Sequence, residues 1–206
     1  MIRSSQRGFS LIELIVVIFI IGIIAAFAVP AVIHVNRGNR LAQTAQIIGD
    51  ELAIARQTAI GHNHVVEVRF YKFSDPETPG SPNSFRAVQV LEVFNARGIS
   101  QVDRAQLLPN AMIIDASPAL SSLLDPGKRT ILAGSTPLPR AGTNYQYAAL
   151  RFRPDGSTDL LPTQGPWFLT VHDETKGDNL TKAPTDFATV EIDPINGSLK
   201  YFRPGL

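Results

Sequence analysis

The stretch "RGFSLIELIVVIFIIGIIAAFAVP", from Arg7 to Pro30, decides how the chain begins. No charged residue occurs from Leu14 to Ile33. About twenty apolar residues are enough to cross the hydrocarbon core of a membrane as a helix. Glu13 stands at the front edge of this run, where lipid offers a carboxylate no stabilising contact. We therefore expect a membrane helix over about residues 14–33 and a specific partner for Glu13.

Two ordinary kinds of N-terminus fit this pattern without needing the acid. A secretory signal peptide would use Arg3 and Arg7 as its basic region and would be cut after Ala28, because Ala26-Phe27-Ala28 has the small-x-small form. A plain membrane anchor would keep Arg3 and Arg7 in the cytoplasm.

A third kind of N-terminus does use Glu13. Cleavage between Gly8 and Phe9 would remove a leader and create an α-amine on Phe9. In a helix, Phe9 and Glu13 occupy positions i and i+4 and lie on one face. An ammonium in an apolar setting needs an anion, within one chain or between two staggered chains. The acid therefore favours a cleaved leader, residues 1–8.

The motif Gly8-Phe9-Ser10-Leu11-Ile12-Glu13, followed by an apolar run, resembles the N-terminal signal of the type IV pilin and pseudopilin superfamily. The resemblance implies cleavage after Gly8 by a membrane prepilin peptidase and N-methylation of Phe9. It also implies packing of the helix with other pilin or pseudopilin subunits in a filament core, where Glu13 pairs with a neighbouring subunit's amine and sets the register. Gly22 and Pro30 stand where the superfamily has helix-weakening residues, and proline removes a helical hydrogen bond.

The helical pattern continues beyond the apolar run. One amphipathic stripe has the 3-4 spacing of a helix face and comprises Leu41, Ala45, Ile48, Leu52, Ala55 and Ala59. Charged and polar residues lie mostly off the stripe, at Arg40, Gln43, Asp50, Glu51, Arg56 and Gln57. With Gly61 as C-cap, the pattern predicts one helix over residues 9–61. Its transmembrane half covers about 14–33, and its amphipathic half, about 38–60, packs on a sheet.

Residues 62–206 read as one β-rich globular domain. Alternating apolar residues predict strands at 65–73, 85–94, 145–153, 167–172, 187–192 and 198–202, the last two forming a hairpin. Residues 106–115 hold a further apolar run. Residues 117–140 are rich in Pro, Gly and Ser and predict a long surface excursion, with a short helix in "ALSSLL". The predicted fold class is α+β, with a long N-terminal helix packed on an antiparallel β-sheet.

Sequences after the apolar run resemble particular groups within this superfamily. "DELAIARQTAIGHNHVVEVRF" (50–70), "LRFRPDGST" (150–158) and "VEIDPINGSLKYF" (190–202) are similar to the H-type minor pseudopilins and the FimT-like minor pilins. The stretch over residues 55–80 resembles the pseudopilin-like Verru_Chthon cassette protein D group. The length of the 117–140 segment departs from a compact H-type domain.

Composition and motifs argue against catalysis. The chain has no cysteine, which excludes a disulfide framework and a thiol nucleophile, and it holds neither a nucleophile elbow nor a phosphate-binding glycine loop. His62 and His64 have no obvious third metal ligand, so we expect a surface loop there. No cofactor is expected; calcium at Asp173, Glu174 and Asp178 is the alternative, although their spacing fits no EF-hand.

The C-terminal residues Lys200, Tyr201 and Arg203 offer an alternative function. FimT-like minor pilins can serve DNA uptake, and these side chains could contact phosphate and stack on a base. The formal net charge is only +1, and removal of Arg3 and Arg7 with the leader would lower it to −1. A terminal strand with solvated side chains is therefore the favoured interpretation, and DNA is not the expected partner.

We therefore expect a minor pseudopilin, a structural subunit of a type II secretion-like or type IV pilus-like filament. Before assembly it would lie in the inner membrane with a cytoplasmic N-terminus, a single membrane pass and a periplasmic globular domain. The alternatives are a DNA-binding minor pilin and a β-protein secreted after signal cleavage.

Overall fold

The computed structural model describes residues 10–94 and 98–204, and for residues 27–35 it describes the backbone alone. The chain forms two compact units, Met1–Asn39 and Arg40–Leu206. The second unit holds the sheet and the C-terminal part of the long helix.

A single helix, α1, runs from Leu11 to His62. The sequence predicted Gly61 as the C-cap, but the helix continues through Gly61, and Asn63 takes the left-handed conformation with φ +55°. Asparagine tolerates this conformation better than most residues, so it ends the helix in the glycine's place.

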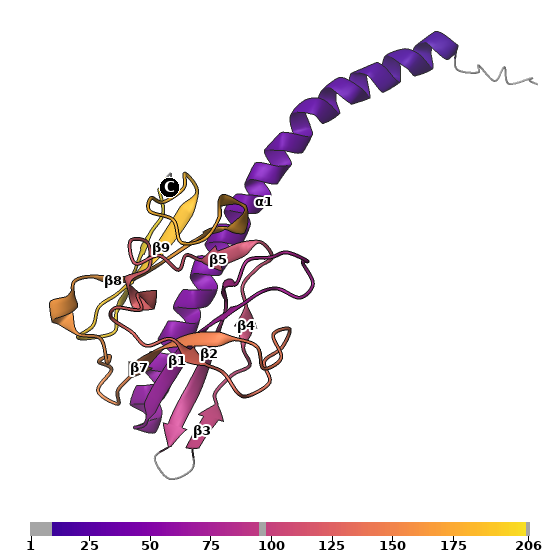
Figure 1. The fold of residues 1–206 in the computed structure, drawn as a ribbon. Helices are drawn as coiled ribbons and strands as arrows, with labels where there is room; N and C mark the ends of the chain where they lie inside the picture. Colours follow the sequence, from indigo (N-terminus) through magenta and orange to yellow (C-terminus); the bar gives the residue numbers. More distant parts are fainter. Residues whose placement is uncertain (1–9, 95–97, 205–206) are drawn as a thin grey trace, which may run out of the picture. The chain divides into compact units, whose positions relative to one another are not determined.

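The predicted amphipathic stripe of α1 is buried against the sheet, and all six of its members belong to the main hydrophobic core. Figure 1 shows this C-terminal part of α1 lying along one face of the sheet. Glu51 is a correction to the predicted pattern: it was placed off the stripe, yet it is only 4% exposed. Thr44 is also fully buried, and its hydroxyl donates a 2.7 Å hydrogen bond to the Arg40 carbonyl oxygen. The buried face of α1 is therefore wider than its apolar stripe.

Within the described residues, ten antiparallel strands form one sheet (Figure 1). The main path runs in the order β10-β9-β8-β5-β2-β1-β7-β6, while β3 and β4 both pair with β2. This arrangement confirms the predicted α+β class. The strands are β1 (Val65–Phe73), β2 (Ser84–Phe94), β3 (Gly98–Gln101), β4 (Gln106–Leu107), β5 (Met112–Ile114), β6 (Leu132–Ala133), β7 (Gln146–Phe152), β8 (Trp167–Asp173), β9 (Phe187–Ile192) and β10 (Leu199–Phe202).

Strand β1 lies between β2 and β7, and its alternating side chains show that the two faces of the sheet differ in chemistry. Val66, Val68 and Phe70 are fully buried in the core shared with α1, as the alternation predicts. The intervening residues point to the opposite, outer face. There Tyr71 and Phe73 join a smaller cluster with Ala87, Leu138 and Tyr145.

The 106–140 region is more buried than its composition predicts. The apolar run divides into β4 and β5, which pair with successive parts of β2. Of the predicted helix in "ALSSLL", only Ser122–Leu124 is helical, as the 3₁₀ turn η1. Because Leu120, Leu123 and Leu124 are buried, the first part of the predicted surface excursion is core. The three leucines outweigh the local richness in small and polar residues.

The chain ends in the predicted hairpin of β9 and β10. The turn between them contains Gly197 with φ +65°, and a Cβ at this position would lie 2.8 Å from the Gly156 carbonyl oxygen. Glycine is therefore required here both by the backbone conformation and by the neighbouring 153–157 turn.

Candidate functional site

The first turn of α1 places Glu13 in a capping arrangement. The Glu13 backbone N–H donates to the Ser10 hydroxyl oxygen at 3.2 Å, and Glu13 is the acidic residue of the first turn. Ser-x-x-Glu is the sequence of a capping box, and an acid is favoured at a helix N-terminus. Ser10 therefore caps the start of α1, and Glu13 stands in the first turn, where an acid is favoured. The sequence predictions did not include this capping contact.

The apolar half of α1 lacks a covering layer among the described residues. Its large apolar side chains from Leu11 to Ile24 are 44–78% exposed. A helix that is apolar on all sides is stable in an apolar environment or against other proteins. This segment therefore needs surroundings that the described part of the chain does not provide.

Several predicted site residues lie wholly or partly outside the described residues. Gly8 and Phe9 lie outside the described residues, as does the side chain of Pro30. The backbone is helical at both Gly22 and Pro30, and a Cβ added at Gly22 would meet nothing within 4 Å. The predicted span, 14–33, includes side chains that are not described. In the part of the chain that is described, no helix is long and apolar enough to cross a membrane.

The C-terminal residues of the DNA hypothesis separate into two environments. Tyr201 and Arg203 line an apolar groove of about 370 Å³ between α1 and the β9–β10 hairpin, whereas Lys200 does not line it. The Tyr201 ring lies against Gly49, where an added Cβ would be 1.7 Å from the hydroxyl oxygen. Burial, together with the nearby charge of Asp50, raises the pKa of Tyr201. The structure therefore does not bring these three side chains together as one phosphate-binding cluster.

The two N-terminal histidines of the sheet unit have separate partners. His62 Nδ1 lies 2.5 Å from a Glu92 carboxylate oxygen, and the His64 ring packs edge-on against Phe94 at 4.8 Å. Among the described residues, no group of three potential ligands is arranged to hold a metal ion.

The three acids of the calcium alternative also contact different groups. Asp173 caps the 3₁₀ turn η3 (Glu174–Lys176) by accepting from the Thr175 N–H. Glu174 pairs with Arg86 at 2.6 Å. Asp178 accepts a 2.9 Å hydrogen bond from the Ala116 N–H. Asp173 thus caps a local turn, whereas Glu174 and Asp178 each join distant segments of the fold. Calcium stays an untested prediction.

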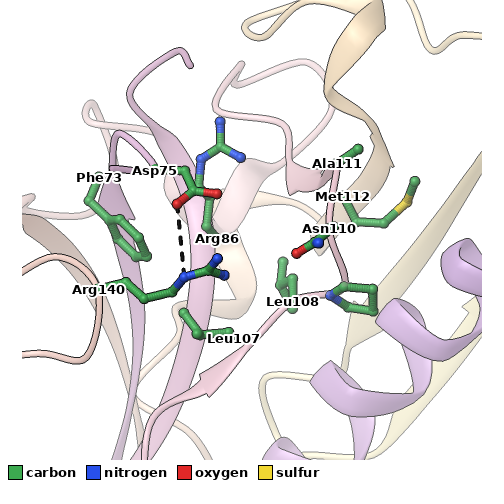
Figure 2. Close-up of a pocket in the computed structure, with 10 residues that line it drawn as sticks. Phe73, Asp75, Arg86, Leu107, Leu108, Asn110, Ala111, Met112 and Arg140 are labelled. Carbon is green, nitrogen blue, oxygen red and sulfur yellow. Dashed lines mark ion pairs between the residues drawn. The ribbon is translucent and has the colours of Figure 1, made fainter. Parts of the chain in front are cut away.

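Figure 2 shows the small cavity beside Arg86, where β2 meets the β4–β5 connection. Its volume is about 20 Å³, which suits one water molecule and excludes an organic ligand. Arg86 Nε is buried and has no hydrogen-bond partner in the described chain. Across the cavity, Arg140 lies 3.9 Å from Asp75 (Figure 2). This is a structural polar site that ties the 75–86 loop to its neighbours.

A buried ion pair joins the strands β5 and β8. His172 Nε2 donates to an Asp115 carboxylate oxygen at 2.8 Å, and both side chains are fully buried. The other ring nitrogen, Nδ1, donates to the Asp173 carbonyl oxygen at 3.0 Å. Asp115 also accepts backbone N–H bonds from Ser117 and Leu180. Although burial opposes both charges, these hydrogen bonds lower the pKa of Asp115 and raise the pKa of His172.

No local motif could have revealed this pair. The two residues are 57 positions apart in the chain and meet only through the pairing of β5 with β8. Within the unit the pair anchors both the 115–124 segment and the 178–180 loop, so its function is structural.

Comparison with known proteins finds a family match at the N-terminus. The family described as the prokaryotic N-terminal methylation motif matches residues 3–29. Residues 3–29 therefore carry a prokaryotic N-terminal methylation motif. The match confirms the signal that was predicted from Gly8 to Glu13 and covers the first part of the apolar run. The role of each individual residue within it remains a prediction.

The folded part has distant structural counterparts. One is similar at a TM-score of 0.47 and 16% identity: the minor pseudopilin EpsH from the type II secretion system of Vibrio cholerae, with 81% of this chain and 98% of that chain covered. Another is the type IV minor pilin FimU of Pseudomonas aeruginosa, with a TM-score of 0.43, 10% identity and coverage of 81% and 94%. No curated protein matches the chain in sequence.

Proposed function

We propose that this chain is a minor pseudopilin, a structural subunit that a prepilin peptidase processes and that assembles with other subunits into a pilus-like filament. The methylation motif over residues 3–29 carries the proposal, because it combines a basic leader, Gly8 and Phe9 at the cleavage site and an apolar helix. The H-type assignment and a type II secretion-like system follow from the resemblances of the sequence.

The exposed apolar half of α1 supports this function. Side chains that are exposed from Leu11 to Ile24 would find apolar surroundings first in the inner membrane and then among the helices of a filament. In this account the N-terminus is cytoplasmic, the helix crosses the membrane once and the sheet unit is periplasmic. Moving from lipid to neighbouring helices changes little for the apolar side chains, so polar contacts decide the register.

Glu13 would supply the decisive polar contact. After cleavage, the methylated amine of Phe9 carries a positive charge that has few partners in an apolar filament core. A carboxylate from an adjacent subunit neutralises it, and such a pair in low dielectric tolerates little axial displacement. The capping contact with Ser10 fixes the helix start close to this carboxylate.

The assembly of Glu13 variants tests the proposal. Glu13→Ala should be cleaved and held in the membrane but depleted from the sheared filament fraction, as judged by immunoblotting. Ser10→Ala is the matched variant, since it removes the helix cap but keeps the carboxylate, and it should assemble. Asp186→Ala removes an exposed acid of the sheet unit and should have no effect. Normal assembly of Glu13→Ala, or equal loss with Ser10→Ala, would contradict the pairing role.

A further inference from the structure

The outer face of the central strands carries an ordered set of charged and aromatic side chains. On β1 this face presents Glu67, Arg69 and Tyr71 in succession. The antiparallel register places β7 residues Arg151, Ala149 and Tyr147 directly beside them. Because these positions alternate with the core positions of the same strands, their chemistry is not required by the core shared with α1.

A buried acid organises the two nearest arginines. Glu67 is 2% exposed, and its two carboxylate oxygens accept from Arg69 Nε at 2.6 Å and from Arg151 Nε at 2.8 Å. Each guanidinium therefore uses its Nε on Glu67. Arg151 is the more accessible of the two, with 54% of its side chain exposed against 14% for Arg69, and the Arg69 guanidinium also interacts with the Tyr71 hydroxyl. The Arg69 guanidinium also lies over the Tyr147 ring at 4.4 Å, which further restricts its orientation.

Around this pair the surface forms a hollow of about 470 Å³, here called the arginine hollow. Arg129 and Lys128 complete its basic lining, and Asp159 is its second acid. Arg129 contacts Asp159 at 2.9 Å, and Lys128 Nζ donates to the Gln164 carbonyl oxygen. The hollow thus contains four basic and two acidic side chains, a local excess of +2 in a chain whose total formal charge is +1.

A second hollow of about 470 Å³ adjoins the first and shares Arg69 and Ile99 with it. We call it the tyrosine hollow because the rings of Tyr71 and Tyr145 line it, packed edge to face with centroids 5.2 Å apart. Their hydroxyls donate internally, to Gln89 and to the Thr136 carbonyl oxygen. The two rings and Leu138 are themselves nearly buried and form the floor of the hollow, while the apolar surface open to a ligand comes mainly from Ile99, Pro137 and Pro139.

We propose that this outer face binds an acidic peptide segment of a partner protein. A Glu or Asp side chain of the segment enters the arginine hollow, where the exposed guanidinium of Arg151, assisted by that of Arg69, takes its carboxylate. A neighbouring apolar side chain enters the tyrosine hollow. Hollows of this size suit single side chains or short segments, and the guanidinium fork matches a carboxylate.

The charge distribution distinguishes a peptide from nucleic acid. One or two carboxylates balance an excess of +2, whereas a polynucleotide needs a longer basic track to neutralise successive phosphates. Glu67 and Asp159 would also repel phosphates that pass over the hollow. A free inorganic anion would leave the apolar tyrosine hollow unused. The proposal does not depend on assembly through the N-terminal helix, because all of these residues belong to the sheet unit.

The test measures fluorescence anisotropy of labelled peptides with the full chain in non-ionic detergent micelles. The probe is a blocked hexapeptide of alternating Glu and Leu. Hexapeptides of Gln with Leu and of Lys with Leu have the same apolar content and control for micelle binding. The Glu-Leu peptide should bind tightest, and Arg151→Gln should weaken its binding at least about tenfold, as expected for loss of a charge-assisted hydrogen-bonded pair. Lys182→Gln, which removes an exposed cation elsewhere, should bind like the wild type.

Two further variants separate a preorganised site from diffuse attraction. Arg151→Lys keeps the charge but loses the planar fork, so it should bind more weakly than the wild type. Glu67→Gln adds a net positive charge but releases both guanidinium groups, so it too should bind more weakly. Fluorescence of Trp167 checks that each variant is folded. Tighter binding by Glu67→Gln, equal binding of the three peptides, or tighter binding of a single-stranded oligonucleotide than of the Glu-Leu peptide would overturn the proposal.

Discussion

Glu51 makes the stability of the sheet unit dependent on pH in a measurable way. Its side chain is 4% exposed on the sheet-facing part of α1, and its Oε2 atom has no hydrogen-bond partner in the described chain. Burial, reinforced by the charges of Asp103 and Asp50, raises the pKa of Glu51 to about 7 from an ordinary 4.5. The folded protein therefore binds this proton more tightly than the unfolded chain does.

The sign and size of the effect follow from linkage. A carboxyl group whose pKa is raised on folding favours the folded state below the unfolded pKa of 4.5, and this advantage is lost as the pH rises through about 7. A shift of that size corresponds to roughly 3 kcal/mol. Such a loss is a large part of the 5–15 kcal/mol that typically stabilises a protein domain, so it is measurable. Between pH 4.5 and 8, the wild type should lose about that much relative to Glu51→Gln, which cannot ionise.

Urea unfolding of the full chain in detergent micelles, followed by the fluorescence of the single Trp167, measures this difference. The midpoints of wild type and Glu51→Gln should diverge by about 1–3 M urea between pH 4.5 and 8. Both proteins keep the Asp115–His172 pair, so its pH dependence cancels in the comparison. Asp103→Asn removes one of the neighbouring charges and should reduce the divergence in part. Parallel pH curves for the two proteins would refute the reasoning and assign Glu51 an ordinary pKa.

Three further substitutions test the fold with the same unfolding assay. Asp115→Asn should lower the free energy of unfolding by about 3–5 kcal/mol, because it leaves a buried imidazolium without its anion, and a loss below about 1 kcal/mol would show that the pair is not formed. In the wild type, the stability that the pair contributes is lost as the pH falls through the lowered pKa of Asp115 or rises through the raised pKa of His172. Gly197→Ala should cost about 1–3 kcal/mol more than Gly142→Ala, since both have a positive φ but only at Gly197 does an added Cβ collide with backbone; equal costs would contradict the close approach. Leu52→Ala should cost about 2–5 kcal/mol, and a cost within the error of the assay would mean that the stripe of α1 does not pack on the sheet.

Local periodicity was sufficient to predict much of the fold. The 3-4 spacing of the α1 stripe and the alternation from Val65 to Phe73 each correspond to residues that are now buried as expected. In both cases a single element needs one continuous apolar face, and that need is visible in a short window of sequence.

The remainder depended on contacts between distant segments. The strand order and the Asp115–His172 pair arise from pairing of β5 with β8, which leaves no local pattern. Glu51 is buried because the sheet and its loops cover more of α1 than the apolar stripe alone. In the 117–140 segment, the prolines, glycines and serines led to the prediction of a surface excursion, although Leu120, Leu123 and Leu124 decide the packing of its first part.

The candidate site shows the same division. The signal around Glu13 is contiguous, so the sequence revealed it, and the match over residues 3–29 agrees. The arginine hollow and the tyrosine hollow are lined by residues of β1, β3, β7 and the 128–159 region, and no short sequence motif predicts them. The capping contact between Ser10 and Glu13 could have been predicted from the pattern Ser-x-x-Glu. It was not, because the same residues belong to the more specific Gly8–Glu13 motif.

Intact-mass and N-terminal peptide mass spectrometry of the protein from its native host test the proposed function most directly. The account predicts a mature chain that begins at Phe9 with a methylated amine, and a Gly8→Leu variant that keeps the eight-residue leader. A native chain that still begins at Met1, or one that begins at Val29 after a secretory cleavage, would contradict it.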